Sequence, residues 1–248
     1  MALRGVLFDY GHTLVDFRRT EEALLEAYTQ IRARIEAALY IEAPEVGHLI
    51  DRVANEVDRR VAASYEDRRL EELDLLRVFD EVLSGTLGLT VPPDVVRHVV
   101  ALDHSAYSRT ISVSDETRAV LRDLRARGLK TGLVSNVSLL PDLMRDDLAN
   151  LGLLDLLDAT TFSSEIGTRK PDPRIFRDAL AKVELEPADA AFVGDRLNDD
   201  VAGAHAVGMR AVQTREFRQE EDPDVQPDAM IARLSELPTA LGLVSSSA

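Results

Sequence analysis

The sequence lacks cysteine altogether, and this absence excludes disulfide bonds, thiolate metal sites and cysteine nucleophiles. It also lacks any uncharged apolar stretch of about 18 residues, so we expect no membrane-spanning helix. The first apolar segment is too short for the hydrophobic region of a secretory signal peptide. These three absences favour a cytoplasmic location.

Positive charge is also scarce. The chain has 29 Lys and Arg residues against 44 Asp and Glu residues, which gives a formal net charge of −15 at pH 7. A chain of this charge repels nucleic-acid phosphates and anionic membrane surfaces, so we expect no nucleic acid and no membrane among its partners. A small phosphorylated metabolite is not excluded, because a local cation or a bound metal ion can outweigh the field of the whole molecule.

Hydrophobic residues make up 45% of the 248 residues, which is enough for a sizeable core. Between about 20 and 108 they recur at helical spacing, as in Leu24, Tyr28 and Ile31, and strand patterns are missing. We therefore expect an all-helical segment. Its predicted helices span 20–39, 50–61 and 71–84, the third ending near Gly85, and a fourth begins after Pro92 and Pro93.

The rest of the chain alternates apolar strand-like runs with helical patterns. The predicted strands span 3–8, 129–136, 159–164, 190–195 and 209–214, and the predicted helices span 114–127, 139–151, 172–183, 200–208 and 229–241. Such alternation predicts an α/β fold with a doubly wound parallel sheet. The first strand must join this sheet, because one strand cannot bury itself. We predict a core domain of residues 1–16 and 109–248 and an inserted helical cap domain of residues 17–108.

Polar residues follow four of the predicted strands, at positions where packing alone does not require them. In strand order they are Asp9; Ser135 and Asn136; Lys170; and Asp195, Asp199 and Asp200. The carboxyl ends of parallel strands meet at one edge of a sheet, and ligands bind beyond that edge. The sequence therefore predicts one site that combines carboxylates, a hydroxyl group and an ammonium group.

This combination suits phosphoryl transfer. An aspartate such as Asp9 can attack phosphorus and form an aspartyl-phosphate. Carboxylate oxygens are the ligands that Mg²⁺ prefers, and the metal would neutralise phosphate charge. Ser135 and Lys170 could hold the non-bridging phosphate oxygens, over which transition-state charge is spread.

Four segments, in order, resemble the motifs of the haloacid dehalogenase-like (HAD) hydrolase superfamily, and the resemblance covers the whole chain. They are LFDYGHTL (7–14), LVSN (133–136), GTRKPDPRIF (167–176) and FVGDRLNDDVAGAHAVGM (192–209). The resemblance implies that Asp9 is the nucleophile and that Lys170 steadies the nucleophile and the phosphate. Ser135 would bind phosphate with Asn136 beside it, and Thr13 would close the first loop.

The resemblance also implies a Mg²⁺ cofactor. Its ligands would be Asp9, the backbone carbonyl of Gly11, Asp195 and Asp200, with Asp199 as the competitor for the last position. The helical insertion resembles a cap that closes over the active site, which implies a small soluble substrate. The cap also offers surfaces for self-association, and both a monomer and a homodimer remain open.

The sequence departs from the family pattern at Gly11. Most phosphatases of the family have a second aspartate there, which protonates the leaving group and later activates water. His12 or Asp16 could take over this role, and a histidine is suited to it because it titrates near neutrality. A substrate with a good leaving group would need little such help.

Three functions therefore remain open. The first is a Mg²⁺-dependent phosphatase that acts on a small phosphorylated metabolite. The second is cleavage of a carbon–halogen or carbon–phosphorus bond, and the third is a non-catalytic protein of this fold that binds a phosphorylated ligand or a partner. Family dehalogenases are metal-free and have an aromatic residue two positions after the nucleophile, whereas Tyr10 is one position after Asp9. Carbon–phosphorus hydrolases of the family use a cap lysine, and residues 17–110 contain none. We expect the phosphatase.

Other polar residues are predicted to be ordinary surface. The charged runs 66–72 and 216–222 are expected to be solvated. The cap histidines His48, His98 and His104 are also expected on solvated faces, and their spacing indicates no metal site.

Overall fold

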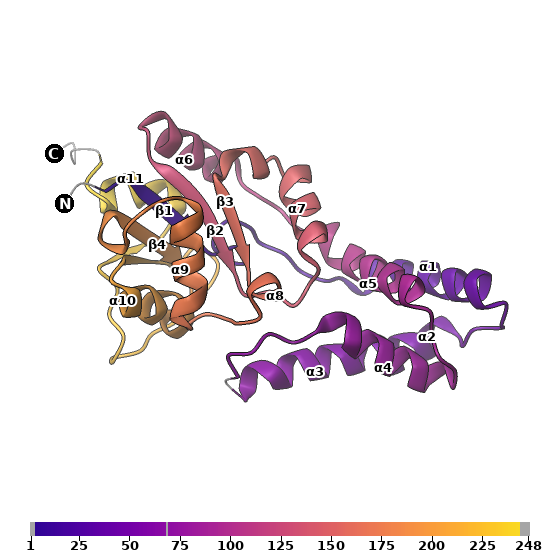
Figure 1. Ribbon diagram of the computed structural model, residues 1–248. Helices are drawn as coiled ribbons and strands as arrows, with labels where there is room; N and C mark the ends of the chain where they lie inside the picture. The colour runs from indigo at the N-terminus through magenta and orange to yellow at the C-terminus, as the bar shows by residue number, and fades with distance from the viewer. Residues whose placement is uncertain (1–2, 68, 244–248) are drawn as a thin grey trace.

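Six parallel strands form one sheet in the order β3-β2-β1-β4-β5-β6, with helices on both faces (Figure 1). The computed structural model describes residues 3–67 and 69–243; the ends of the predicted core domain and Arg68 of the first charged run lie outside this part. The strands are β1 (Gly5–Phe8), β2 (Lys130–Ser135), β3 (Ala159–Phe162), β4 (Ala190–Gly194), β5 (Arg210–Thr214) and β6 (Ala229–Ile231). The predicted doubly wound α/β fold is confirmed.

The two central strands β1 and β4 carry no polar side chain, and helices cover the sheet on both sides. Every residue of β1 is buried, and Leu7 lies between Gly132 of β2 and Phe192 of β4. A continuous apolar run of this kind is typical of a parallel strand that is buried on both faces. The burial of β1 in the middle of the sheet places the residue that follows it at the centre of the sheet edge.

The helices of the sheet layer follow the predicted alternation. They are α6 (Asp115–Ala126), α7 (Pro141–Asn150), α8 (Ser163–Ile166), α9 (Pro173–Lys182), α10 (Gly203–Val207) and α11 (Leu237–Ala240), with a π-helical turn at Leu197–Ala202. Helix α6 begins after Ser114, whose side chain accepts a hydrogen bond from the Thr117 amide. It is followed by Gly128 in the left-handed conformation, as the sequence predicts.

The predicted helix over 229–241 is wrong in its first half. Ala229–Ile231 forms strand β6, which pairs in parallel with β5, and only short helical turns follow it. The apolar residues of this segment occur at helical spacing, but the open edge of β5 offers backbone hydrogen bonds. A three-residue strand is too short to show its own periodicity, so the sequence pattern alone favours the helix.

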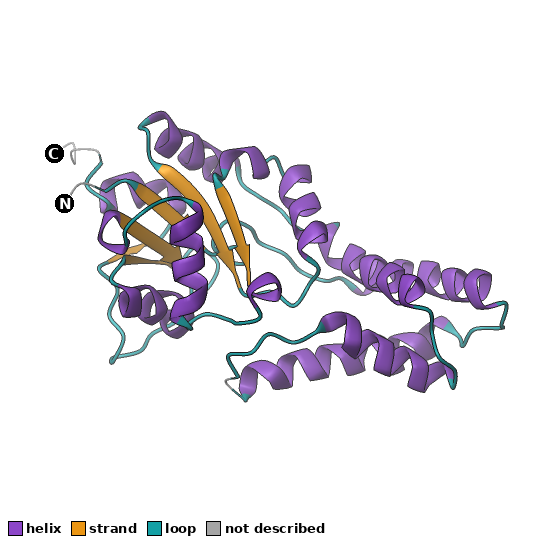
Figure 2. Cartoon of the chain, in the orientation of Figure 1, coloured by secondary structure: helices purple, strands orange, loops and turns teal. Residues whose placement is uncertain are grey.

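The segment between β1 and α6 is helical, as predicted (Figure 2). Its helices are α1 (Glu21–Leu39), α2 (Val46–Leu49), α3 (Asn55–Glu66), α4 (Leu75–Leu87) and α5 (Pro93–Ser108), with a π-helical stretch at Ile50–Ala54. Helices α1 and α5 pack side by side, and the Tyr28 hydroxyl of α1 donates to Asp103 of α5 at 2.8 Å.

The bounds of α4 differ from the prediction of a helix over 71–84. The helix begins after Asp74, whose side chain accepts a hydrogen bond from the Arg77 amide, and it ends at Gly88 with φ of 68°. Gly85 therefore lies inside the helix, because the left-handed turn that ends it occurs one turn later. The residues before Asp74 are extended, and they contact the sheet layer.

Two linkers connect this helical segment to the sheet, and they lie side by side. Asp16 and Ser112 form an antiparallel bridge in which each backbone amide donates to the other residue's carbonyl, at 3.0 and 2.8 Å. The chain thus leaves the sheet layer and returns to it at nearly one point. Within residues 3–67 and 69–243, no helix combines the length and the apolar character that crossing a lipid bilayer needs.

Candidate active site

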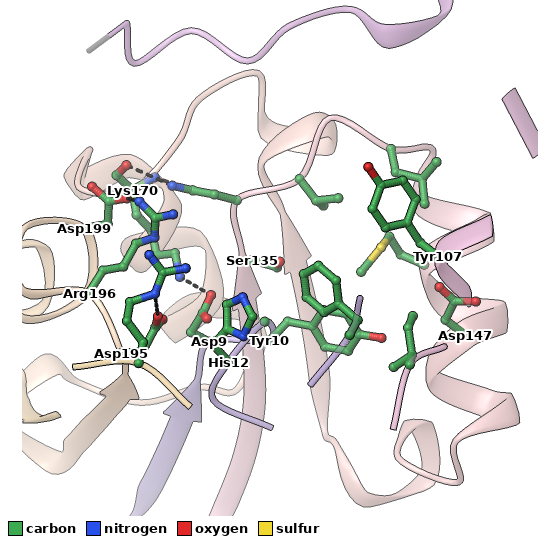
Figure 3. Close-up of a pocket in the computed structure, with 18 of the residues that line it drawn as sticks. Asp9, Tyr10, His12, Tyr107, Ser135, Asp147, Lys170, Asp195, Arg196 and Asp199 are labelled. Carbon is green, nitrogen blue, oxygen red and sulfur yellow. Dashed lines mark hydrogen bonds and ion pairs between the residues drawn. The ribbon is translucent and has the colours of Figure 1, made fainter. Parts of the chain in front are cut away.

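Asp9 directly follows β1, and its backbone amide donates to Val193 of β4 at 2.9 Å. Its side chain is almost fully buried and accepts a hydrogen bond from the Lys170 ammonium group at 2.5 Å (Figure 3). The same ammonium group donates to Asp200 at 2.7 Å. The structure therefore brings the predicted nucleophile and the predicted lysine into direct contact.

Burial raises the pKa of Asp9 to about 6, although Lys170 opposes this shift. Burial alone would lower the pKa of Lys170, but the charges of Asp200 and Asp9 raise it above its ordinary value. Lys170 is therefore a permanent cation in this site. Its charge keeps the carboxylate of Asp9 available at neutral pH.

The backbone of Lys170 is held by Asn136. The Asn136 amide nitrogen donates to the Lys170 carbonyl at 3.0 Å, and the Lys170 amide donates to the Asn136 side-chain oxygen at 2.7 Å. Both polar atoms of the Asn136 side chain thus form hydrogen bonds with the backbone of Lys170. Ser135, the residue before it, is buried and lines the same pocket as Asp9.

Asp9, Asp195 and Asp200 form a carboxylate cluster, in which one oxygen of each residue lies within 4.8 Å of the others. Burial, together with the charges of Asp9 and Asp200, raises the pKa of Asp195 to about 7. Three buried hard-oxygen donors that repel one another suit a divalent cation such as Mg²⁺. The cluster therefore fits the metal that the sequence predicts.

The geometry separates the two acidic candidates of the fourth motif. Asp200 belongs to the carboxylate cluster, and its second oxygen accepts a hydrogen bond from the Arg196 amide at 2.9 Å. A Cβ atom at Gly194 would lie 2.3 Å from the Asp200 carboxylate, so only glycine leaves room for this approach. Asp199 lines the pocket outside the cluster and lies 3.8 Å from the Arg196 guanidinium.

The loop after Asp9 turns tightly through residues 10–15. The amides of Leu14 and Val15 donate to the Tyr10 carbonyl at 3.0 and 3.2 Å, and Thr13 is fully buried inside this turn. His12 has φ of 59°, and its ring is stacked on Phe17 with 5.1 Å between centroids. Partial burial and the charge of Arg218 lower the pKa of His12. Its imidazole is therefore neutral at neutral pH.

Arg218 is a site residue that the sequence analysis missed. It comes from the run 216–222, which was predicted to be solvated, and its guanidinium nitrogen lies 2.6 Å from Asp195. Glu220 of the same run accepts a hydrogen bond from the Leu197 amide at 2.9 Å. The run follows β5 on the same sheet edge, so the rule that located Asp9 could have indicated it. The prediction of a solvated run is wrong because this loop returns across the site.

The run 66–72 is also not wholly solvated. Glu72 forms an ion pair of 2.5 Å with Arg169, and each side chain is only 2% exposed. The ring of Tyr65 lies 3.9 Å from the Arg169 guanidinium, and the Arg169 amide donates to the Leu70 carbonyl at 2.7 Å. We call this contact the Glu72–Arg169 latch. It attaches the helical segment to the core directly beside Lys170.

A pocket of about 300 Å³ lies over the sheet edge. Asp9, Lys170 and Asp195 line one end, and apolar side chains from both the core and the helical segment line the rest. His104 lines it too, with its Nε2 atom 2.6 Å from Asp147 of α7. The prediction that His104 is solvated is therefore wrong, because α5 packs against α7 there, whereas His48 and His98 are exposed as predicted.

A sequence model of the haloacid dehalogenase-like hydrolase family matches residues 3–208. The chain belongs to this family. It is 32% identical to the phosphoserine phosphatase of Thermus thermophilus, over 95% of this chain and 98% of that protein.

Two crystal structures of HAD proteins also match the chain. A HAD phosphatase from Thermococcus onnurineus is 27% identical with a TM-score of 0.61, over 97% of this chain and 98% of that one. A 2-haloacid dehalogenase from Pseudomonas syringae is 26% identical with a TM-score of 0.66, over 97% of this chain and 99% of that one.

The structure gives a physical reason for the departure from the HAD pattern at Gly11. A Cβ atom at this position would lie 3.0 Å from the edge of the Phe17 ring. A contact this short is tighter than most Cβ contacts, so a side chain at position 11 would press on the Phe17 ring and the ring would have to shift slightly. The His12 ring stacks on the same phenylalanine and lines the pocket with Asp9.

Proposed function

We propose that this HAD hydrolase is a Mg²⁺-dependent phosphatase that cleaves a small phosphorylated metabolite through an aspartyl-phosphate on Asp9. The observation that carries the proposal is the direct contact of Asp9 with Lys170 inside the carboxylate cluster. A nucleophilic carboxylate, a permanent cation and a site for a divalent metal are what phosphoryl transfer requires. The phosphoserine phosphatase relative supports the same reaction class.

In the first step the Asp9 carboxylate attacks phosphorus, the new oxygen–phosphorus bond forms, and the bond to the leaving alcohol breaks. Lys170 already donates to Asp9, so it orients the attacking oxygen and places a positive charge beside the phosphoryl group. The Ser135 hydroxyl lines the pocket at this end and would donate to a non-bridging oxygen. The groups that would hold Mg²⁺ are the carboxylates of Asp9, Asp195 and Asp200 and the carbonyl of Gly11. The bound metal would neutralise phosphate charge.

The leaving alcohol needs a proton, and water must lose one when it hydrolyses the aspartyl-phosphate. We assign this transfer to His12, in place of the aspartate that Gly11 replaces. Its imidazolium form, the minor one at neutral pH because the pKa is lowered, donates a proton to the leaving alcohol, and the neutral ring then takes a proton from the attacking water. Its ring lines the pocket beside Asp9, and its Nδ1 atom lies 3.5 Å from Asp16. Asp16 would stabilise the imidazolium form while the proton is held.

We also propose the division into a core domain of residues 1–16 and 109–248 and a cap domain of residues 17–108. Helices α1 to α5 supply Tyr65, His104 and Tyr107 to the pocket, whereas the sheet edge supplies the reacting groups. The cap would exclude water from the phosphoryl group and contact the leaving group.

Hydrolysis of p-nitrophenyl phosphate with and without Mg²⁺ tests the proposal. The wild type should turn the ester over only with the metal, and Asp9→Asn should lose at least about 10³-fold, because the amide is a poor nucleophile. Asp200→Asn should also lose most activity, whereas Asp199→Asn, the matched control outside the cluster, should lose far less. Metal-independent release of chloride from 2-chloropropionate, with no phosphatase activity, would replace this proposal with a dehalogenase.

A further inference from the structure

We infer that the far half of the pocket selects phosphate monoesters whose leaving group has a flat apolar body and a neutral hydrogen-bonding group at its end. The inference rests on the proposed phosphatase function and narrows its substrate class. It depends on three features: apolar walls, an unpartnered buried hydroxyl group, and a carboxylate that excludes anions.

The walls of the far half are apolar or aromatic. They are formed by Phe17, Tyr107, Ile111, Val137, Leu139 and Met144. Phe17 and Tyr107 meet edge to face with 6.5 Å between ring centroids, and both present ring surface to the space. A polyol placed here would leave hydroxyl groups without partners, and each buried unpaired hydroxyl group weakens binding. A flat apolar body instead gains from leaving water.

Tyr10 supplies the second feature. Its side chain is only 6% exposed, and its hydroxyl group meets no hydrogen-bond partner within residues 3–67 and 69–243. A phenol hydroxyl group carries its proton at neutral pH, so it can act as a hydrogen-bond donor here. The ring lines the pocket, and its hydroxyl end lies on the Asp147 side (Figure 3). A buried donor without a partner indicates that a ligand atom accepts its hydrogen bond.

Asp147 supplies the third feature. Its carboxylate is buried at the far end, where it is paired with His104 at 2.6 Å. The pair joins α5 to α7 and closes this end of the pocket. An anionic group at the end of the substrate would lie against this carboxylate and would be repelled. A hydroxyl group suits the place better, because it can accept from Tyr10 and donate to Asp147 at the same time.

Benzyl phosphate and 4-(hydroxymethyl)benzyl phosphate test this inference, because their leaving alcohols are nearly equal in reactivity. For the wild type, kcat/KM should be about tenfold higher for the hydroxymethyl ester, the effect of one hydrogen bond to a buried donor. Both esters should exceed glycerol 3-phosphate and O-phosphoserine by at least about tenfold. Tyr10→Phe should reduce the ratio between the two benzyl esters to about one. Tyr65→Phe, a matched change at another pocket tyrosine, should leave the ratio near the wild-type value.

An unchanged ratio in Tyr10→Phe, or O-phosphoserine as the better substrate, would overturn the inference even if p-nitrophenyl phosphate is hydrolysed. Calorimetric binding of benzylphosphonate and 4-(hydroxymethyl)benzylphosphonate measures the same preference without turnover. A protein that hydrolyses no ester but binds the hydroxymethyl phosphonate about tenfold more tightly, in a manner that needs the Tyr10 hydroxyl, would refute the phosphatase while supporting the inferred selectivity. Equal binding of both phosphonates would overturn the selectivity in that case too.

Discussion

At the scale of single residues, Gly11 and His12 both lie beside the ring of Phe17. Gly11 avoids the Phe17 ring, and the His12 ring stacks against the same phenylalanine. The loss of a carboxylate at position 11 and the presence of an imidazole at position 12 are therefore parts of one packing arrangement. Either residue alone would be a weak indication of altered chemistry.

His12→Ala should lower kcat/KM by about 10²-fold or more for benzyl phosphate, because its alcohol is a poor leaving group that needs a proton. The loss should be small for p-nitrophenyl phosphate, whose phenolate leaves without one. Steady-state kinetics with both esters measure the difference. An equal loss for both would assign His12 a structural role only.

Restoring the family's carboxylate sharpens this experiment. In the His12→Ala background, Gly11→Asp combined with Phe17→Leu should recover part of the activity on benzyl phosphate, since leucine frees the space beside position 11. Gly11→Asp without the change at Phe17 should recover less. Equal recovery in both backgrounds would show that the ring does not limit the position.

At the scale of elements, the Glu72–Arg169 latch joins the extended segment before α4 to the segment that carries Lys170. Both side chains are 2% exposed, so water does not solvate either charge. Each charge is compensated by its partner instead. The ion pair is reinforced by hydrogen bonds from Ser138 and Ser163 to Glu72, at 2.7 and 2.5 Å. The position of the helical segment and the position of Lys170 are thereby coupled.

Glu72→Ala should lower the free energy of unfolding by about 3–5 kcal/mol, because it leaves the Arg169 charge buried without compensation. Combining Glu72→Leu with Arg169→Met should recover much of this loss, since it removes both charges. Denaturant unfolding of the three proteins measures the effect, with Glu71→Ala at the exposed neighbouring position as the control. A loss below about 1 kcal/mol for Glu72→Ala would mean that solvent reaches Arg169 and that the latch is not closed in solution.

Much of the element order was predictable, whereas contacts between distant elements were not. Asp9, Ser135 and Asp195 are recognisable because each ends or directly follows a strand, and Lys170 lies in the loop that comes after β3 and α8. Chain order then places all four on one edge. His104 and Glu72 give no such indication. Their partners, Asp147 and Arg169, are far away in the sequence, and only the docking of the helical segment brings them together. Strand β6 was missed for the same reason, since its partner β5 and not its own pattern determines it.

At the scale of the whole molecule, part of the excess negative charge is buried in the site, where repulsion between the carboxylates opposes folding. The carboxylate cluster buries Asp9, Asp195 and Asp200 together, and they meet fewer cations than carboxylates: Lys170 contacts Asp9 and Asp200, and Arg218 contacts Asp195. A cation that binds the folded chain alone would relieve this repulsion and raise the stability of the entire protein.

Saturating Mg²⁺, at about 100 times its dissociation constant, should stabilise the wild type by about 2.7 kcal/mol. For a chain of this size that corresponds to a rise in Tm of about 5–10 °C. Calorimetry with and without the metal measures the shift, which Asp195→Asn should largely lose and Asp199→Asn should retain. An equal shift in all three proteins would locate the binding elsewhere on the acidic surface.

The antiparallel bridge between Asp16 and Ser112 has a consequence for how such a molecule can change over time. The chain leaves the sheet layer and returns to it at one point. The intervening segment is therefore a closed loop from the point of view of strand pairing, whatever its length. The entropic cost of closing a loop grows slowly with its length, by about 0.6 kcal/mol for each doubling. Insertions, deletions or wholesale replacement between these two residues would therefore leave the strand register almost undisturbed. The bridge therefore lets the inserted helical segment change in length or composition while the strands beneath the pocket keep their places.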